Sequence, residues 1–297
     1  MKKIAIVGAN SYIARNLILS LKSMEEEFEL KLYDIGTEQV DGFENYTKVD
    51  INSSDSVKKI DFTSDIIYMF VGKTGSESGF KEYNTFLDIN EKALLSFLNE
   101  YVSQQSRAKI IFPSTRLVYR GKEKRLNEDS EKEFKTIYAI NKYACEKYLE
   151  MFNNVYNINY CIFRICIPYG TLIPNASSYG TAEFMLSKAT KGENISLYGD
   201  GNVRRTLTYM GDLCKILIDG ALSDKCINDV YNIGGEDYSL NEMASLIAKK
   251  FNVEIDYKPW PEIARAIESG NTVFEDKKLK DILNYEISEF NKWIDNI

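Results

Sequence analysis

The sequence predicts an α/β protein with a doubly wound parallel sheet and a smaller mixed α/β lobe. Short apolar runs alternate with longer helical patterns through the first half of the chain, and the texture changes after about residue 167. Strand–helix alternation predicts βαβ units whose helices cover both faces of a parallel sheet. We therefore expect a first domain over residues 1–166 and a second over 167–297, with segments of the second returning to the first.

The elements follow from these patterns in chain order. Strands are expected at 3–7, 29–34, 47–50, 65–71, 109–113 and 159–165, with helices near 12–24, 53–60, 83–105 and 134–155. Right-handed crossovers between such strands place a ligand at their carboxyl ends. The second part opens with IPYGTLIPNASSYG, a loop rich in Pro, Gly, Ser and Asn. Further helices are expected at 180–191, 211–223 and 239–251.

Composition excludes several classes of function. The chain of 297 residues contains no histidine, which rules out Ser-His-Asp hydrolysis and HExxH metallohydrolysis. Its net charge of −7 and its scattered lysines argue against nucleic-acid binding. The five cysteines have a ragged spacing that indicates neither a disulfide framework nor a metal site. Without a membrane-length apolar run or a signal-peptide core, we expect a cytoplasmic protein with no membrane partner.

The first expected strand runs into the sequence GANSYIARNL, which has the spacing of a dinucleotide-binding glycine loop. Gly8, Ser11 and Ala14 occupy the three positions where that pattern has glycines. One glycine of three is weak evidence, and a plain strand–turn–helix would look similar. Asp34 strengthens the case, because it ends the second strand, where a carboxylate would bind the adenosine ribose hydroxyls. No arginine follows it to neutralise a 2′-phosphate, so NAD is favoured over NADP.

Tyr138 and Lys142 form the candidate proton-transfer pair. Being four residues apart in the helix expected at 134–155, they project from one helical face. A nearby ammonium, helped by a positively charged nicotinamide, would stabilise a phenolate and lower the tyrosine pKa, so that the tyrosine could take a hydroxyl proton as hydride leaves. Tyr143 and Lys147 repeat the YxxxK spacing but lie about 140° around the helix, so both tyrosines cannot face one cleft.

Ser114 and Thr115 follow the strand expected at 109–113, at the sheet edge where ligands bind. A hydroxyl there could hydrogen-bond the reacting sugar oxygen and share its proton with Tyr138. A polar turn that merely caps the strand is the alternative.

With these pieces in order, the chain resembles the extended short-chain dehydrogenase/reductases, also called the NAD-dependent epimerase/dehydratase family. Its UDP-glucose 4-epimerase-like members are the most similar. The resemblance implies a Rossmann fold and covers nearly the whole chain. It is carried by the glycine loop, Asp34, the pair Asp50–Ile51, Asn90 in LDIN, PSTRLVYRG, YAINK, FRICIPYG, YGDGNVRR, the stretch Tyr209–Asp212 and VYNIGG.

The resemblance also implies roles for individual residues. Tyr138 is implied as the general acid/base, Lys142 as its electrostatic partner and Thr115 as the catalytic hydroxyl. Ser114 and Thr115 face the substrate in this reading, and Arg205 and Arg265 match arginines on its diphosphate. Cofactor contacts are implied for Gly8, Ser11, Tyr12, Ile13, Asp34, Asp50, Ile51, Lys73, Asn90 and Lys142.

Three functions stay open at this point. The first is an NAD-dependent nucleotide-sugar epimerase that transiently oxidises C4, and the second is an NAD(P)H-dependent 4-ketoreductase. The third is a non-catalytic nucleotide-binding protein of the same fold. It is motivated by the loss of glycines at positions 11 and 14 and by Phe70, Ile167 and Thr206, which depart from the family pattern. A dehydratase is not expected, because Arg116 and Leu117 stand where 4,6-dehydratases have an Asp-Glu pair. Family members commonly dimerise through the helices at 83–105 and 134–155, which leaves a homodimer open.

Overall fold

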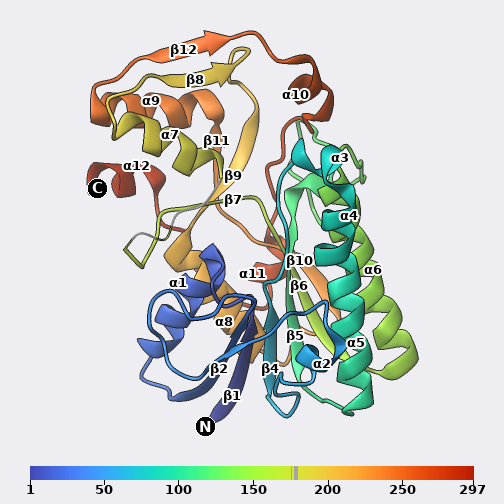
Figure 1. Ribbon diagram of the computed structural model, residues 1–297. Helices are drawn as coiled ribbons and strands as arrows, with labels where there is room; N and C mark the ends of the chain where they lie inside the picture. The colour runs from blue at the N-terminus through green and yellow to red at the C-terminus, as the bar shows by residue number, and fades with distance from the viewer. Residues whose placement is uncertain (175, 177–179) are drawn as a thin grey trace.

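The computed structural model describes residues 1–174, 176 and 180–297, which form two lobes (Figure 1). In the larger lobe a seven-stranded sheet has the order β10-β6-β5-β4-β1-β2-β3, and every neighbouring pair is parallel. Its strands are β1 (Lys2–Val7), β2 (Phe28–Asp34), β3 (Tyr46–Lys48), β4 (Ile66–Met69), β5 (Lys109–Thr115), β6 (Asn159–Ile165) and β10 (Asp229–Asn232). The doubly wound fold is thereby confirmed. Strand order reverses between β1 and β4, where such sheets bind ligands.

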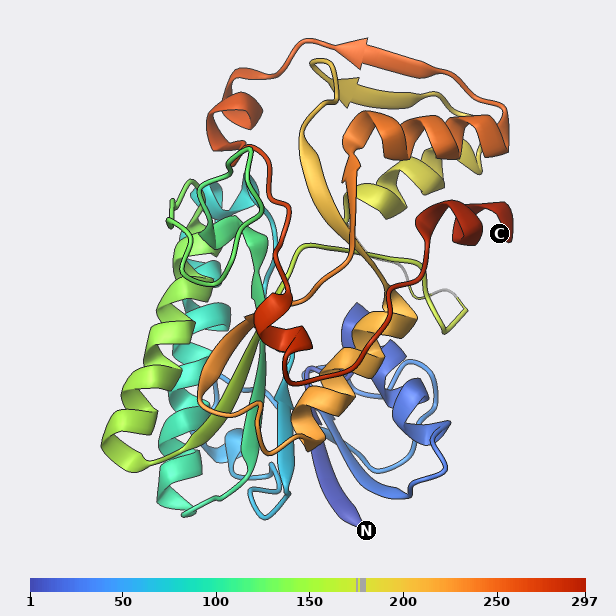
Figure 2. The same cartoon turned by 180° about the vertical axis from the view of Figure 1, so that it is seen from behind.

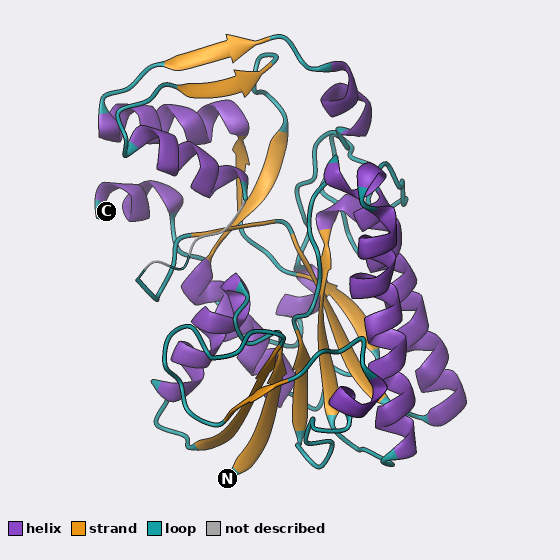
Figure 3. Ribbon diagram, viewed as in Figure 1, coloured by secondary structure: helices purple, strands orange, loops and turns teal. Residues whose placement is uncertain are grey.

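Helices cover both faces of this sheet (Figure 3). On one face lie α5 (Ala93–Ser103) and α6 (Ile137–Tyr156), and on the other α1 (Tyr12–Lys22) and α8 (Met210–Leu222). Strand β1 shows why the strands are apolar throughout: Ile4 and Ile6 pack with α1 and α8, while Ala5 and Val7 pack with α5 and α6. No helix within the described residues is both long and apolar enough to cross a membrane.

The smaller lobe has its own core. Two small sheets, ordered β11-β9-β7 and β12-β8, pack with three helices. The elements are β7 (Ile167–Tyr169), β8 (Ile195–Tyr198), β9 (Arg204–Tyr209), β11 (Glu236–Ser239), β12 (Ile255–Lys258), α7 (Thr181–Ala189), α9 (Leu240–Phe251) and α12 (Phe290–Asp295). The chain passes repeatedly between the lobes, because α8 and β10 belong to the larger one. Figure 2 shows the segment after α10 (Glu262–Ile267) descending to α11 (Lys277–Lys280) before it returns to α12.

The long helix expected at 83–105 is interrupted. It consists of α4 (Tyr83–Phe86), a π-helical segment η1 (Leu87–Lys92) and α5. The sequence pattern does not reveal this wider turn, which is a feature often found at functional sites. The helix expected near 53–60 is the shorter α2 (Ser54–Val57). The sequence does not predict α3 (Ser78–Lys81) or the 3-10 turn η2 (Arg116–Val118).

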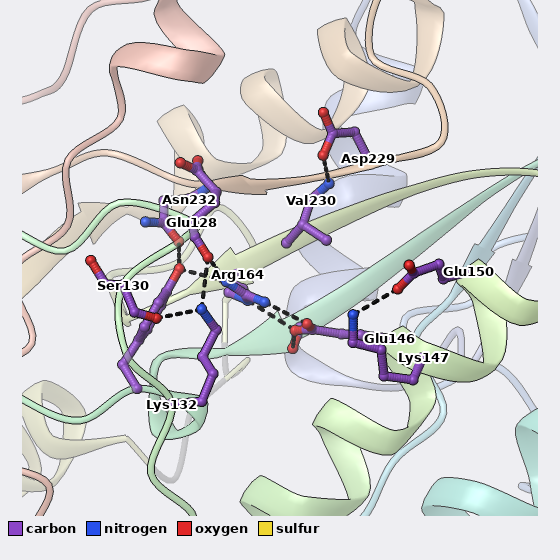
Figure 4. A network of polar contacts seen from close by, with 12 residues as sticks. Glu128, Ser130, Lys132, Glu146, Lys147, Glu150, Arg164, Asp229, Val230 and Asn232 are labelled. Carbon is purple, nitrogen blue, oxygen red and sulfur yellow. Dashed lines mark hydrogen bonds and ion pairs between the residues drawn. The ribbon is translucent and has the colours of Figure 1, made fainter.

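A buried ion pair fixes α6 against the sheet. Glu146 of α6 and Arg164 of β6 form a two-pronged contact at 2.6 and 3.0 Å, and their side chains are only 3% and 4% exposed (Figure 4). Arg164 also donates to the hydroxyl of Tyr119, which in turn donates to Asn232 of β10. Burial works against the charge of Arg164, but the Glu146 carboxylate overcomes it and raises the guanidinium pKa. The network thus joins α6 to two strands of the sheet.

Replacing Glu146 by Gln should lower the free energy of unfolding by about 3 kcal/mol, because Arg164 would keep a buried charge without its counterion. Urea unfolding measures the change. Glu150→Gln is the matched control on the same helix, since Glu150 pairs with Lys147 at the surface. The control should stay within about 0.5 kcal/mol of the wild type. Equal losses of stability in the two variants would contradict a stabilising role of the buried Glu146–Arg164 ion pair.

Candidate active site

The turn after β1 lies at the switch point of the sheet. Gly8 has φ +89°, and a Cβ built there would lie 2.7 Å from the carbonyl carbon of Phe70 and 2.8 Å from the backbone nitrogen of Val71. Both the backbone angle and the close approach therefore require glycine. This is the first glycine of the predicted loop, and it brings the end of β1 against the residues that follow β4.

Ser11 is the N-cap of α1, but its side chain does not cap the helix. Its hydroxyl is one of two side-chain groups among the described residues that are buried without a hydrogen-bond partner. The first turn of a helix also carries N–H groups without an intrahelical acceptor. An unpartnered hydroxyl beside such N–H groups fits the phosphates of a dinucleotide.

Asp34 ends β2 next to this loop. Its carboxylate accepts hydrogen bonds from the backbone N–H of Asn10 at 2.9 Å and of Ile35 at 2.7 Å. The side chain is therefore held at the glycine loop, and its unused lone pairs could accept ribose hydroxyls. Asp50 follows β3, the strand paired with β2, and its carboxylate accepts from the N–H of Asn52 at 3.0 Å. Ile51 beside it is buried in the core.

Tyr12 and Ile13 begin α1. The hydroxyl of Tyr12 donates a short hydrogen bond to the carbonyl of Gly170, in the loop after β7. Burial raises the pKa of this phenol. The structure therefore uses Tyr12 to tie the glycine loop to the start of the second lobe. Ile13 packs partly buried against the core between α1 and α8.

The pair on α6 is positioned from the start of that helix. Thr136 caps it by accepting a hydrogen bond from the N–H of Ala139 at 3.1 Å, which sets Tyr138 in the first turn and Lys142 one turn later. The ammonium of Lys142 donates to the carbonyl of Pro113 in β5 at 2.8 Å and lies 4.3 Å from the ring centre of Phe112. Lys142 thus lies along the end of β5.

Thr115, the last residue of β5, lies close enough to Tyr138 for its hydroxyl to act against the burial of the phenol and lower the phenol pKa. Its hydroxyl also accepts from the N–H of Leu117 at 3.3 Å. The structure therefore brings Thr115, Tyr138 and Lys142 together, as the sequence predicts. The second YxxxK copy lies elsewhere, with Tyr143 packed against Phe134.

Burial dominates the electrostatics of this group. It raises the pKa of Tyr138, with Thr115 opposing, and lowers the pKa of Lys142 to about 8, with Cys145 and Glu146 opposing. The lowering of the tyrosine pKa that the sequence predicts includes the charge of a nicotinamide, and without that charge burial keeps the phenol pKa raised. The Lys142 ammonium donates instead to the carbonyl of Pro113, and burial is the largest influence on the phenol pKa. The positive charge of an oxidised nicotinamide, when bound nearby, would favour the phenolate.

Asn90 connects the interrupted helix to the site. From η1 its side chain accepts from the N–H of Lys73 at 2.8 Å and donates to the carbonyl of Lys73 at 3.1 Å, which clamps the loop after β4. A Cβ on Gly72 would lie 3.3 Å from the Asn90 oxygen and 3.7 Å from the Lys142 nitrogen. Asn90 and Lys142 therefore flank the same turn. The ammonium of Lys73 pairs with Glu82 at 2.8 Å.

The remaining predicted substrate residues are arranged less simply. The hydroxyl of Ser114 donates to Glu146 at 2.5 Å, so it serves the buried network beneath the site. Arg205 is 2% exposed and bonds to Glu268 at 2.5 Å and to the carbonyl of Gly270 at 2.6 Å. Arg265 is exposed and lines a cavity of about 410 Å³ together with Lys135, Trp260, Glu268 and Ser269. Arg205 lies inside the wall behind this cavity.

Comparison with known proteins agrees with this geometry. The sequence profile of the NAD dependent epimerase/dehydratase family matches residues 4–234. The chain belongs to this family. A protein of Methanocaldococcus jannaschii described as "Putative UDP-glucose 4-epimerase" is 25% identical over 252 residues, covering 82% of this chain and 81% of its own.

Solved structures share the fold over nearly the whole chain. The UDP-glucose 4-epimerase of Thermotoga maritima, determined with UDP-glucose, has a TM-score of 0.85 at 20% identity and covers 98% of this chain and 96% of its own. The UDP-glucose 4-epimerase of Thermus thermophilus, in complex with NAD, has a TM-score of 0.81 at 19% identity, with 94% and 92% covered. As a member of this family the chain uses NAD, and the loop at Gly8, Ser11 and Asp34 fits that cofactor.

Sequence reasoning did not include Arg116 among the candidate site residues. Arg116 follows Thr115 directly, and its side chain reaches the hydroxyls of Ser269 and Thr272 in the wall around Arg205. In the sequence it counted only as a departure from the acidic pair of dehydratases. An arginine directly after the predicted catalytic hydroxyl was the available signal.

Replacing Lys142 by Met should raise the free energy of unfolding at pH 7 by about 1 to 3 kcal/mol. The folded chain holds this ammonium with a pKa of about 8, against 10.5 for an ordinary lysine. The cost of keeping it charged is fully present below pH 8 and fades as the pH rises to 10.5, because between these values the unfolded state binds more protons. Urea unfolding at pH 7 and pH 10 should therefore show the variant's advantage shrinking. A variant that is less stable than the wild type at both pH values would contradict this.

Proposed function

We propose that this protein is an NAD-dependent 4-epimerase of a nucleoside-diphosphate sugar. The observation that carries the proposal is the meeting of Thr115, Tyr138 and Lys142 at the carboxyl end of β5, beside the switch point of the sheet. The names of the relatives, which include UDP-glucose 4-epimerases, support a nucleotide sugar as the substrate.

The chain's own residues account for the proton transfers. Thr115 holds the C4 hydroxyl of the sugar, and Tyr138 takes its proton as the C4 hydrogen leaves. NAD, when bound, supplies the reversible hydride acceptor and the positive charge that favours the phenolate. Lys142 orients the ribose side of the cofactor and adds to that charge. The resulting 4-keto sugar would turn within the site, and Tyr138 would return the proton to its C4 oxygen on the other face of the sugar, so that no net oxidation occurs.

The lining of the cavity beside Arg265 is consistent with binding of the nucleotide part of the substrate. Arg265, Lys135 and Arg120 contribute positive charge to its lining, against Glu133 and Glu268. An aromatic ring, that of Trp260, lies in the same wall. Guanidinium and ammonium groups bind phosphates, and an aromatic ring can stack on a nucleotide base.

A 4-ketoreductase is the second candidate, because the same three residues would return one proton and one hydride to a 4-keto sugar. Cofactor that remains bound through many turnovers without net loss supports the epimerase. Net oxidation of NADH or NADPH by a 4-keto sugar supports the reductase.

Replacing Tyr138 by Phe should reduce kcat by at least about 100-fold, because the general acid/base is lost. NAD should still bind. Proton NMR of the sugar's C4 stereochemistry measures turnover, and native mass spectrometry measures cofactor content. Tyr143→Phe is the matched control from the second YxxxK copy and should keep full activity. Unchanged activity of the Tyr138 variant with NAD still bound would overturn the enzyme proposal in favour of a non-catalytic binding protein.

We also propose that the chain forms a homodimer through α6 and its neighbours. Ile140, Met151 and Val155 are exposed on α6, and the first two lie eleven positions apart, on one face of the helix. Leu87 of η1 is exposed as well. Light scattering should give twice the chain mass for the wild type and a single chain mass for Met151→Glu. A wild-type mass of one chain would contradict the dimer.

A further inference from the structure

Arg116 carries a positive charge in the wall of the site. It begins the turn η2 immediately after Thr115. Its Nη1 donates to the hydroxyls of Ser269 at 3.0 Å and Thr272 at 3.4 Å. Both acceptors are neutral, so the hydrogen bonds orient the guanidinium without balancing its charge.

The surroundings do not supply a counterion. Among the described residues, no carboxylate lies within ion-pair distance of Arg116. The nearby carboxylate, that of Glu268, is hydrogen-bonded to Arg205 at 2.5 Å. Glu268 therefore balances the charge of Arg205 and leaves Arg116 without an ion pair. Burial, followed by the charge of Arg205, lowers the pKa of Arg116 to about 10. A partly desolvated cation beside another cation destabilises the folded protein unless an anion binds next to it.

One edge of the Arg116 guanidinium is free. Its Nε and Nη2 have no hydrogen-bond partner in the described part of the chain, since both of its hydrogen bonds leave from Nη1. They are also not sealed in the interior: the buried groups without a partner in that part are the hydroxyls of Ser11 and Ser64. The residue keeps a partly exposed surface. The Nε–Nη2 edge is one that can grip a carboxylate or phosphate with two parallel hydrogen bonds.

We propose that Arg116 binds an anionic group of the substrate through this free edge. The inference rests on the proposed function, because it places a nucleotide sugar against Thr115. Two parts of such a molecule offer the same oxyanion chemistry. One is a carboxylate carried by the sugar ring, as in a uronic acid, and the other is the diphosphate.

Calorimetric titration of the NAD-loaded protein distinguishes these sources. The probes are UDP-glucuronate and UDP-glucose, which differ in a carboxylate on the sugar, and UDP, which has no sugar. If the sugar carboxylate is the anion, the wild type prefers UDP-glucuronate to UDP-glucose by about 10-fold or more, and Arg116→Met removes this preference while leaving UDP-glucose binding unchanged. If the diphosphate is the anion, Arg116→Met weakens all three ligands by a similar factor of about 10 or more.

Two further variants keep the test sharp. Arg116→Lys retains the charge but loses the two-pronged grip, so its binding should fall between wild type and Arg116→Met, and it stands in if the methionine variant fails to fold. Arg107→Met removes an exposed arginine beyond the opposite end of β5 and should bind all three ligands as the wild type does. Wild-type affinities for every ligand in a folded Arg116→Met protein would overturn the proposal. That result would leave the proposed function standing, which depends instead on the loss of turnover in Tyr138→Phe.

Discussion

The buried contact between Glu146 and Arg164 sets the rotation of α6, and the site depends on that rotation. Tyr138, Lys142 and Glu146 follow one another at intervals of four residues, so they share one face of the helix. Once Glu146 is locked to β6, Lys142 falls beside Pro113 and Tyr138 beside Thr115. A small rotation of the helix would carry all three away from the strand. The ion pair therefore acts as an alignment device for chemistry one and two turns away.

The site concentrates positive charge in places where water is scarce. Lys142 and Arg116 both have pKa values lowered chiefly by burial, and neither is paired with a carboxylate among the described residues. Arg164, by contrast, is a buried cation that is paired with an anion of the same chain, Glu146. The contrast suits a site whose anions arrive with the ligand. Such a site sacrifices stability of the empty protein for attraction to a charged molecule.

Much of the larger lobe follows from sequence periodicity. The strand expected at 159–165 has the observed bounds, and the helix expected at 134–155 differs by a few residues at its ends. Apolar runs buried on both faces leave little ambiguity. The π-helical segment at Leu87–Lys92 could not be predicted this way, because a six-residue segment is too short to change the apolar periodicity of the helical stretch around it. The grouping of Thr115, Tyr138 and Lys142 was predictable from strand ends and helix spacing. The side-chain orientations of Ser114 and Arg205 could not be predicted, because each is set by a hydrogen-bond partner that is distant in sequence. These partners are Glu146 for Ser114 and Glu268 for Arg205.

The path of the chain has a consequence for the two lobes. Strand β9 of the small lobe runs directly into α8 of the large one, β10 returns to the large sheet, and the segment from α10 visits α11 before ending at α12. Each lobe therefore contains pieces from several separated stretches of sequence. Neither can be cut out as a continuous fragment with a complete core, so the lobes should gain and lose their structure together. We therefore expect the two lobes to unfold as one cooperative unit and not as two independently folding domains.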